Sequence, residues 1–241
     1  CDSCRYSPSM NVRRAVRDAR DLIRPTIRAS WSQYAEDLVL LDVLTAGTPG
    51  RIGTYVDVGC NHPKRFSNTY ALYRAGWRGL AVDLDPSLCR QLRLARPRDQ
   101  VVCAALGAKA GTKTVYRFTS SELSTTNPEW AARFVSEGQT PTGQEEIRIR
   151  TLDDLVAEHR AFLGDRIDLL TIDAEGSEQS ILEGLDFGRT RPTTVMLEVP
   201  TELALPSDGA IGVLEREGYR LRARLYNSAL WQDARPAQRP R

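Results

Sequence analysis

Short, largely apolar segments alternate with amphipathic ones along most of the chain, and this alternation constrains the fold more than any other feature. Thr54–Val58 shows no polar alternation except at Asp57, as expected for a strand that is buried on both faces of a sheet. Because helical segments separate such strands, the pattern predicts an α/β fold with a doubly wound, mostly parallel, Rossmann-like sheet. Further buried strands are predicted over 79–83, 101–106, 167–172 and 193–199.

Capping residues and helix stops delimit the helices between these strands. Ser67 is a candidate N-cap for a helix over 68–75, because its hydroxyl can accept a bond from a free N–H of the first turn. Asp85 caps a helix with Pro86 at its first position, and Thr151–Asp154 has the spacing of a capping box. The chain closes with predicted helices over 177–183 and 208–218 and strands over 219–224 and 226–231.

The region between the third and fourth buried strands departs from this alternation. Segments 112–118 and 146–152 alternate polar and apolar residues, as half-exposed strands do. They predict a hairpin insertion, and the polar stretch 119–146 predicts a lid or substrate loop that sets specificity. That stretch contains Ser124, Thr125, Thr126, Trp130 and Phe134.

These boundaries divide the chain into three parts. We expect an amino-terminal helical arm over 1–30, one catalytic or binding domain over 31–232 and a disordered, Pro/Arg-rich tail over 233–241. Within the arm, Asn11–Arg24 reads as a basic amphipathic helix that caps the domain. A role for that helix at a membrane surface, or in docking a second copy within a homodimer, stays open.

Composition narrows the classes of partner. The 33 basic and 31 acidic side chains leave a formal charge of +2, which lacks the basic excess typical of nucleic-acid binding proteins. No segment approaches the roughly 20 apolar residues of a membrane span, and no apolar secretory core follows the amino terminus. The odd number of cysteines, 5, argues against a disulfide framework. We therefore expect a cytoplasmic protein with no membrane span and no nucleic-acid partner.

Carboxylates cluster where the predicted strands end. In an open parallel sheet, ligands bind outside the carboxyl ends of the strands, near the point where strand order reverses. Four of the five predicted strand ends carry an acid there, at Asp57, Asp83, Asp173 with Glu175, and Glu198. A purely structural sheet has little reason to place acids at this edge, so the pattern indicates a ligand site.

The turn after the first strand indicates the type of cofactor. Gly59 lets the backbone approach a ligand closely, and Asp83 ends the second strand, where an acid accepts hydrogen bonds from ribose hydroxyls. The turn nevertheless lacks the G-x-G-x-x-G pattern that cradles a pyrophosphate. A nucleoside without phosphates therefore fits better, and S-adenosylmethionine is the candidate. We expect its adenine near Leu84 and Ala104 and its methionine part near Gly59.

Several short motifs support this cofactor. They are Ser32–Asp37, Tyr55–Pro63 with Asn61 in its turn, Ser67–Tyr70 with Asn68, Gly76–Gly79, and Ile172–Glu178. In this order they resemble the motifs of the FkbM-type methyltransferase family, including its S-Q-x-G-E-D and D-x-E-G-x-E patterns. The sequence departs from the family at Ala35, where Gly is usual, at Cys60, where Ala is usual, and at Thr171, where Lys is common.

The resemblance implies a class I methyltransferase fold and O-methylation of a small-molecule hydroxyl, often on a sugar or a secondary metabolite. It adds Gln33, Asn61, Ser67 and Asn68 to Asp57, Gly59, Asp83, Leu84, Ala104 and Asp173 as expected cofactor-binding residues. Asp173 and Glu175 are the candidates that orient or deprotonate the acceptor hydroxyl. His62 is a further candidate base, because an imidazole titrates near neutral pH.

Alternative roles remain for these residues. Asp173 is equally suited to binding the methionine amino group, and His62 before Pro63 to holding a turn through backbone bonds. Glu178 is better explained by the helix start, where carboxylates are favoured. Asp173, Glu175 and Glu198 could instead hold a divalent metal ion, which the spacing does not require. A non-catalytic nucleoside-binding module and, less readily, a nicotinamide-dependent oxidoreductase are the rival functions.

Overall fold

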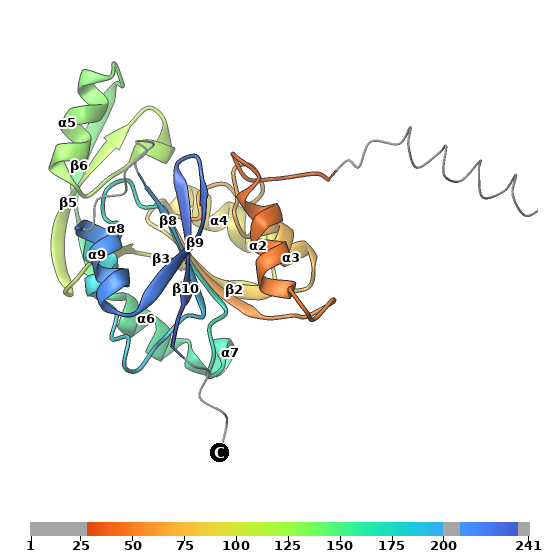
Figure 1. The fold of residues 1–241 in the computed structure, drawn as a ribbon. Helices are drawn as coiled ribbons and strands as arrows, with labels where there is room; N and C mark the ends of the chain where they lie inside the picture. The colour runs from red at the N-terminus through yellow and green to blue at the C-terminus, as the bar shows by residue number, and fades with distance from the viewer. Residues whose placement is uncertain (1–27, 200–207, 236–241) are drawn as a thin grey trace, which may run out of the picture.

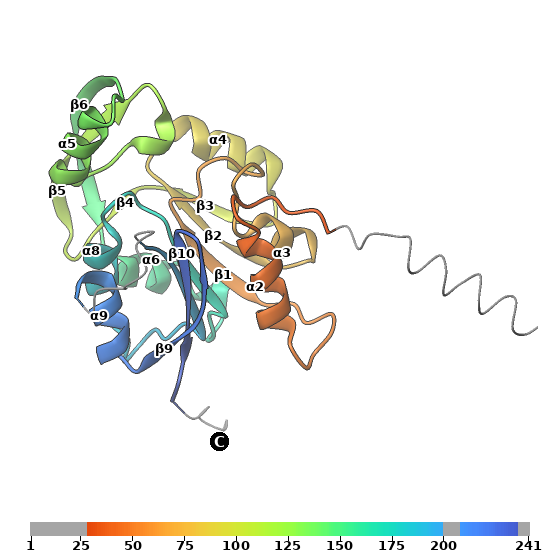
Figure 2. The same cartoon turned by 45° about the horizontal axis from the view of Figure 1, so that its top comes forward.

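The computed structural model describes residues 28–199 and 208–235. Their largest element is a seven-stranded sheet with the strand order β3-β2-β1-β7-β8-β10-β9 (Figures 1 and 2). Neighbouring strands from β3 to β8 are parallel, and β10 pairs antiparallel with both β8 and β9. The strands are β1 (Thr54–Val58), β2 (Arg78–Asp83), β3 (Gln100–Cys103), β7 (Leu169–Ile172), β8 (Thr194–Glu198), β9 (Tyr219–Leu225) and β10 (Ser228–Asp233).

Helices cover both faces of this sheet (Figure 2). On one face lie α2 (Glu36–Thr45), α3 (Tyr70–Arg74) and α4 (Pro86–Ala95). The other face carries α6 (Leu152–Glu158), α7 (Arg160–Leu163), α8 (Glu178–Glu183) and α9 (Gly209–Arg216). Each face has its own apolar core, the larger of which packs α6, α8 and α9 against the sheet. The predicted doubly wound, mostly parallel α/β fold is confirmed.

A smaller unit is inserted between β3 and α6. Its three-stranded sheet has the order β4-β6-β5, formed by β4 (Ala105–Leu106), β5 (Gly111–Phe118) and β6 (Pro141–Arg150). The helix α5 (Pro128–Ser136) packs on it through Phe134, which contacts Phe118 edge-on with ring centroids 5.5 Å apart. A 3-10 turn, η1 (Ser121–Leu123), precedes that helix. The predicted hairpin insertion is therefore present.

Three features differ from the sequence prediction in this region. The second insertion strand, predicted over 146–152, runs over Pro141–Arg150. The predicted strand 101–106 is two strands, because the chain leaves the large sheet after Cys103 and Ala105–Leu106 pairs with β6. The predicted loop 119–146 holds a helix whose N-cap is Asn127, with a side chain that accepts bonds from the backbone N–H groups of Glu129 and Trp130.

Other predicted boundaries shift by only a few residues. The helix expected over 68–75 begins at Tyr70, although the Ser67 hydroxyl still accepts a bond from the Tyr70 N–H. Asp85 and Thr151 cap their helices as predicted. Asp233, expected in the tail, is the last residue of β10. The predicted helix Asn11–Arg24 lies outside the described residues. No helix within 28–199 or 208–235 combines the length and apolar character that a bilayer crossing requires.

A fully buried arginine joins the turn after β1 to the end of α4. Arg96 is 0% exposed and donates to the Pro63 carbonyl at 2.8 Å, to the Thr69 hydroxyl at 2.9 Å and to the Ser67 hydroxyl. Its guanidinium lies 3.9 Å from Asp57 and 3.7 Å from Asp99. These contacts balance the buried charges and fix the path of residues 63–69.

We predict that Arg96→Met destabilises the fold by about 3–5 kcal/mol, because removing one partner leaves buried carboxylates without a counter-ion. Urea unfolding followed by circular dichroism measures the change. The matched control is Arg90→Met, at an exposed position on α4, the helix that ends just before Arg96. It should change the free energy of unfolding by under about 0.5 kcal/mol. Equal effects of the two substitutions would contradict the prediction.

Candidate active site

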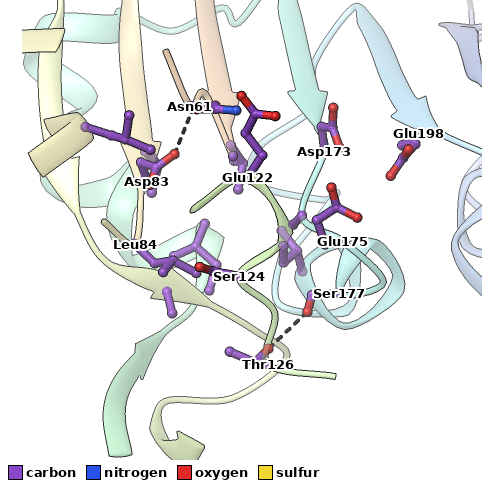
Figure 3. A pocket seen from close by; sticks show the side chains of 18 of the residues that line it. Asn61, Asp83, Leu84, Glu122, Ser124, Thr126, Asp173, Glu175, Ser177 and Glu198 are labelled. Atoms are coloured by element: carbon purple, nitrogen blue, oxygen red, sulfur yellow. Dashed lines mark hydrogen bonds between the residues drawn. The ribbon is translucent and has the colours of Figure 1, made fainter. Parts of the chain in front are cut away.

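A cavity opens at the carboxyl ends of β1, β2, β7 and β8 (Figure 3). It lies across the junction of β1 and β7, where the strand order reverses, as expected for an open α/β sheet. The space between the lining residues, about 1060 Å³ with its open mouth included, is continuous with solvent. In Figure 3, Asp83 and Glu198 lie at opposite sides of the cavity, with Asp173 and Glu175 between them.

The Asp83 end fits a nucleoside. One oxygen of the Asp83 carboxylate accepts a bond from the Asn61 N–H, and the other accepts from the Asp85 N–H, both at 2.8 Å. Each carboxylate oxygen has a second lone pair, so Asp83 can still accept bonds from ribose hydroxyls. Apolar side chains provide the surface that a base needs, and they are Val82, Leu84, Leu88, Ala104, Ala105, Leu106 and Ile181.

Gly59 is required because the backbone of another strand end lies against it. Gly59 has φ +76°, and a Cβ at this position would lie 1.7 Å from the carbonyl oxygen of Asp173. Any side chain would therefore push β1 and β7 apart at the point where both strands line the cavity. The glycine that the sequence assigned to close approach of a ligand serves first to bring two strand ends together.

Four predicted site residues lie outside the cavity lining. Asp57 is buried and accepts a bond from the Thr69 hydroxyl, Ser67 bonds to Arg96, and Asn68 lies in the same turn. Nδ1 of His62 accepts bonds from the N–H groups of Lys64 and Arg65, at 3.1 and 2.9 Å. Burial and nearby cationic side chains lower the His62 pKa. The geometry of His62 thus matches the alternative interpretation of a residue that holds the turn.

The remaining predictions converge on the cavity. Its lining includes Gln33, Gly59, Asn61, Asp83, Leu84, Ala104, Asp173 and Glu175, together with Glu198. Lining residues without a predicted role include Phe66, Glu122, Ser177 and Asn227. Of these four residues, only Glu122 could have been predicted from the sequence, as an acid within the polar stretch of the insertion. Asn227 reaches the cavity through the β9–β10 turn, and no local sequence pattern predicts that position.

Three carboxylates meet at the far side of the cavity from Asp83. One oxygen each of Asp173, Glu175 and Glu198 lies within 4.8 Å of the others. Burial, followed by the charges of neighbouring acids, raises the pKa of Glu175 and of Glu198 to about 8, and the same causes raise the pKa of Asp173. Oε2 of Glu198 is buried without a hydrogen-bond partner. This group can accept a proton or bind a cation near neutral pH.

The turn that carries Asp173 and Glu175 is held by two sets of bonds. Oε1 of Glu178 accepts bonds from the N–H groups of Ala174 at 2.8 Å and Gly176 at 3.3 Å, which agrees with a structural role for this acid. From the insertion, the Thr125 hydroxyl donates to the Glu175 carbonyl at 2.7 Å, and Asn127 donates to the Gly176 carbonyl.

Close packing completes this junction. A Cβ at Gly176 would lie 2.2 Å from the ring of Trp130 on α5, so the insertion sits directly against the turn. Ser124 and Thr126 of the insertion line the cavity below the carboxylates (Figure 3). Trp130 and Phe134, predicted with them as specificity residues, belong instead to the apolar cluster of the insertion.

The Methyltransferase FkbM domain model matches residues 57–221. The chain belongs to the FkbM methyltransferase family. This membership confirms the predicted family, the class I methyltransferase fold and S-adenosylmethionine as the cofactor. A search of curated protein sequences finds no match.

Among solved structures, the chain is similar to methyltransferases at low sequence identity. A TehB-like S-adenosylmethionine-dependent methyltransferase from Corynebacterium glutamicum is 13% identical, with 93% of this chain and 97% of the other covered and a TM-score of 0.42. An O-methyltransferase from Bacillus cereus, in complex with S-adenosylhomocysteine, is 12% identical, with 94% and 90% covered and a TM-score of 0.41.

The raised pKa values predict how the stability of this FkbM domain depends on pH. Folded Glu175 and Glu198 titrate at about 8, whereas glutamates in an unfolded chain titrate near ~4.3. Between these values the folded state binds more protons than the unfolded state, so its stability falls as pH rises. Urea unfolding of ligand-free protein at several pH values from 5 to 8 should show this fall.

Glu175→Gln should make the fall with pH shallower, because the glutamine side chain does not titrate. The matched control is Glu215→Gln, at an exposed position on α9, which should leave the slope unchanged. Parallel pH profiles for wild type and Glu175→Gln would show that Glu175 does not titrate in this range.

Proposed function

We propose that this FkbM methyltransferase transfers a methyl group to a hydroxyl of a small molecule, a sugar or glycoside or a hydroxylated secondary metabolite. The observation that carries the proposal is the group Asp173, Glu175 and Glu198 beside the predicted cofactor position. A hydroxyl is a weak nucleophile that must lose its proton as it attacks. A carboxylate whose pKa lies near the working pH suits that task.

Residues at one end of the cavity bind the cofactor, and residues at the other end act on the acceptor. S-adenosylmethionine supplies a methyl group that is already activated by its sulfonium charge. Asp83 holds the ribose hydroxyls, and the apolar lining near Leu84 and Ala104 takes the adenine. Asp173 and Glu175 hold the acceptor oxygen and take its proton, while Glu198 shares the proton through its proximity to both. Positioning of the two reactants supplies a large part of the rate enhancement.

Asp83→Asn tests the cofactor site. Charge-assisted hydrogen bonds contribute about 1.5–3 kcal/mol each, so we expect the dissociation constant of S-adenosylhomocysteine, measured by calorimetry, to rise about 10- to 100-fold. Asp85→Asn is the matched control, since asparagine also caps helices well. Retained affinity in Asp83→Asn would place the ribose elsewhere.

Asp173→Asn and Glu175→Gln test the chemistry. Loss of a general base lowers kcat by about 10²- to 10⁴-fold, whereas the affinity for S-adenosylhomocysteine should change little. The assay is release of S-adenosylhomocysteine with a panel of glycosides and hydroxylated metabolites. Glu183→Gln, exposed at the end of α8, is the control. Unchanged turnover in both variants would refute the catalytic roles.

The same assays separate the two alternative roles of the carboxylates. If Asp173→Asn weakens cofactor binding and leaves kcat intact, Asp173 binds the methionine amino group. If dialysis against EDTA abolishes turnover and Mg²⁺ restores it, the three carboxylates hold a divalent ion that lowers the pKa of the acceptor. Location in the cytoplasm and assembly as a homodimer stay predictions from the sequence.

A further inference from the structure

Two exposed tyrosines contact each other near residues that line the cavity. The rings of Tyr34 and Tyr226 have centroids 4.4 Å apart and an interplanar angle of 45°. Tyr34 is 38% exposed and Tyr226 is 61% exposed. Each adjoins a residue that lines the cavity, Gln33 in the first case and Asn227 in the second. Neither tyrosine is itself part of the lining, so the pair forms a separate exposed surface next to the cavity.

A buried acid brings these two segments together. Glu36 is 2% exposed, and its carboxylate accepts a bond from the Tyr34 N–H at 2.7 Å and from the Ser228 hydroxyl at 3.3 Å. It thus joins the segment before α2 to the start of β10, more than 190 residues later. Figure 2 shows the turn between β9 and β10 beside that segment. The arrangement is built into the fold.

The backbone at both tyrosines is also constrained. Tyr226 has φ 46°, and Ala35, which follows Tyr34, has φ 66°. Left-handed backbone is costly for residues other than glycine, and it persists where the surroundings enforce it, often at ligand sites. The other described non-glycine residues with positive φ, which are Asn61, Phe66 and Glu175, all line the same cavity.

The tyrosine pair connects directly to the proposed chemistry. Nδ2 of Asn227 donates to Oε1 of Glu198 at 3.3 Å, and the Val199 N–H donates to the Asn227 carbonyl at 2.7 Å. Asn227 therefore links the turn that carries Tyr226 to the group of three carboxylates. An acceptor bound beside Asn227 would lie next to the groups proposed to act on its hydroxyl.

We propose that Tyr34 and Tyr226 form the acceptor platform and that it takes a saccharide ring. This rests on the proposed hydroxyl methylation. A pyranose ring has an apolar C–H face that packs on aromatic rings and a rim of hydroxyls that both donate and accept. The amides of Gln33 and Asn227 also donate and accept, so they match such a rim. A flat phenolic acceptor could also stack on the two tyrosine rings, but it would leave most donors and acceptors of the Gln33 and Asn227 amides without hydrogen-bond partners.

The test measures glycoside binding directly. Protein saturated with S-adenosylhomocysteine is titrated with the methyl glycosides of glucose, galactose, mannose, rhamnose and xylose, with catechol as a phenolic comparison, by saturation-transfer NMR. We expect at least one glycoside to bind and Tyr226→Ala or Tyr34→Ala to weaken it on the order of tenfold, the loss of one aromatic contact. Affinity for S-adenosylhomocysteine should stay unchanged.

Two variants control for folding. Tyr226→Phe keeps the ring and should keep glycoside binding. Leu221→Ala, at an exposed position on β9, the strand that precedes the turn with Tyr226, should behave as wild type. Binding of no glycoside in the panel, binding of catechol alone, or glycoside binding that is indifferent to both alanine substitutions would overturn the platform.

Turnover measured on the same panel distinguishes this inference from the proposed function. Methylation of catechol alone would uphold hydroxyl methylation and overturn the saccharide platform. Tyrosine-dependent glycoside binding without S-adenosylhomocysteine release would uphold the platform and count against hydroxyl methylation of these sugars.

Discussion

The turn after β1 depends on the hydrogen bonds and ion pairs of one buried side chain, the guanidinium of Arg96. Dinucleotide-binding turns follow their first strand with glycines that cradle phosphates, and this chain has no such pattern. The conformation of this turn is held instead by hydrogen bonds that Arg96 donates to Pro63, Ser67 and Thr69. Burying this charge is costly unless it is paired, and Asp57 and Asp99 provide the pairing. The polar side chains of this motif, Asp57, Ser67 and Thr69, thus bond mainly to other protein groups and stabilise the turn.

At the end of the cavity opposite Asp83, the buried acidic side chains lie next to one another. Asp173, Glu175 and Glu198 have each other as neighbours, and each raises the pKa of another. Such a group is unfavourable in the empty protein once it is ionised. A cationic ligand relieves that cost, and S-adenosylmethionine carries a sulfonium and an ammonium group. The raised pKa values therefore make this group able to hold a proton or accept a cation near neutral pH.

Local sequence signals predicted what depends on local physics. The strand Thr54–Val58 and the Asp85 and Thr151 caps are correct because burial and capping are properties of a few adjacent residues. The end of β3 at Cys103 was not predicted, because an apolar segment has the same sequence pattern whether it stays in one sheet or continues into a second. The helix α5 could have been found, since Asn127 before Pro128 repeats the signal of Asp85 before Pro86.

The site residues divide in the same way. Acids at strand ends were identified because topology places every such end at one edge of the sheet. The role of Asp57 and Ser67 depends on Arg96, far along the chain, and no spacing reveals that partner. Likewise Glu36 of the amino-terminal motif does not line the cavity, but it positions Tyr34 against Tyr226. In this protein Asp57 and Glu36 of the motifs hold the backbone around the cavity, whereas Asp173 and Glu175 of the last motif line it together with less distinctive residues such as Gln33 and Asn227.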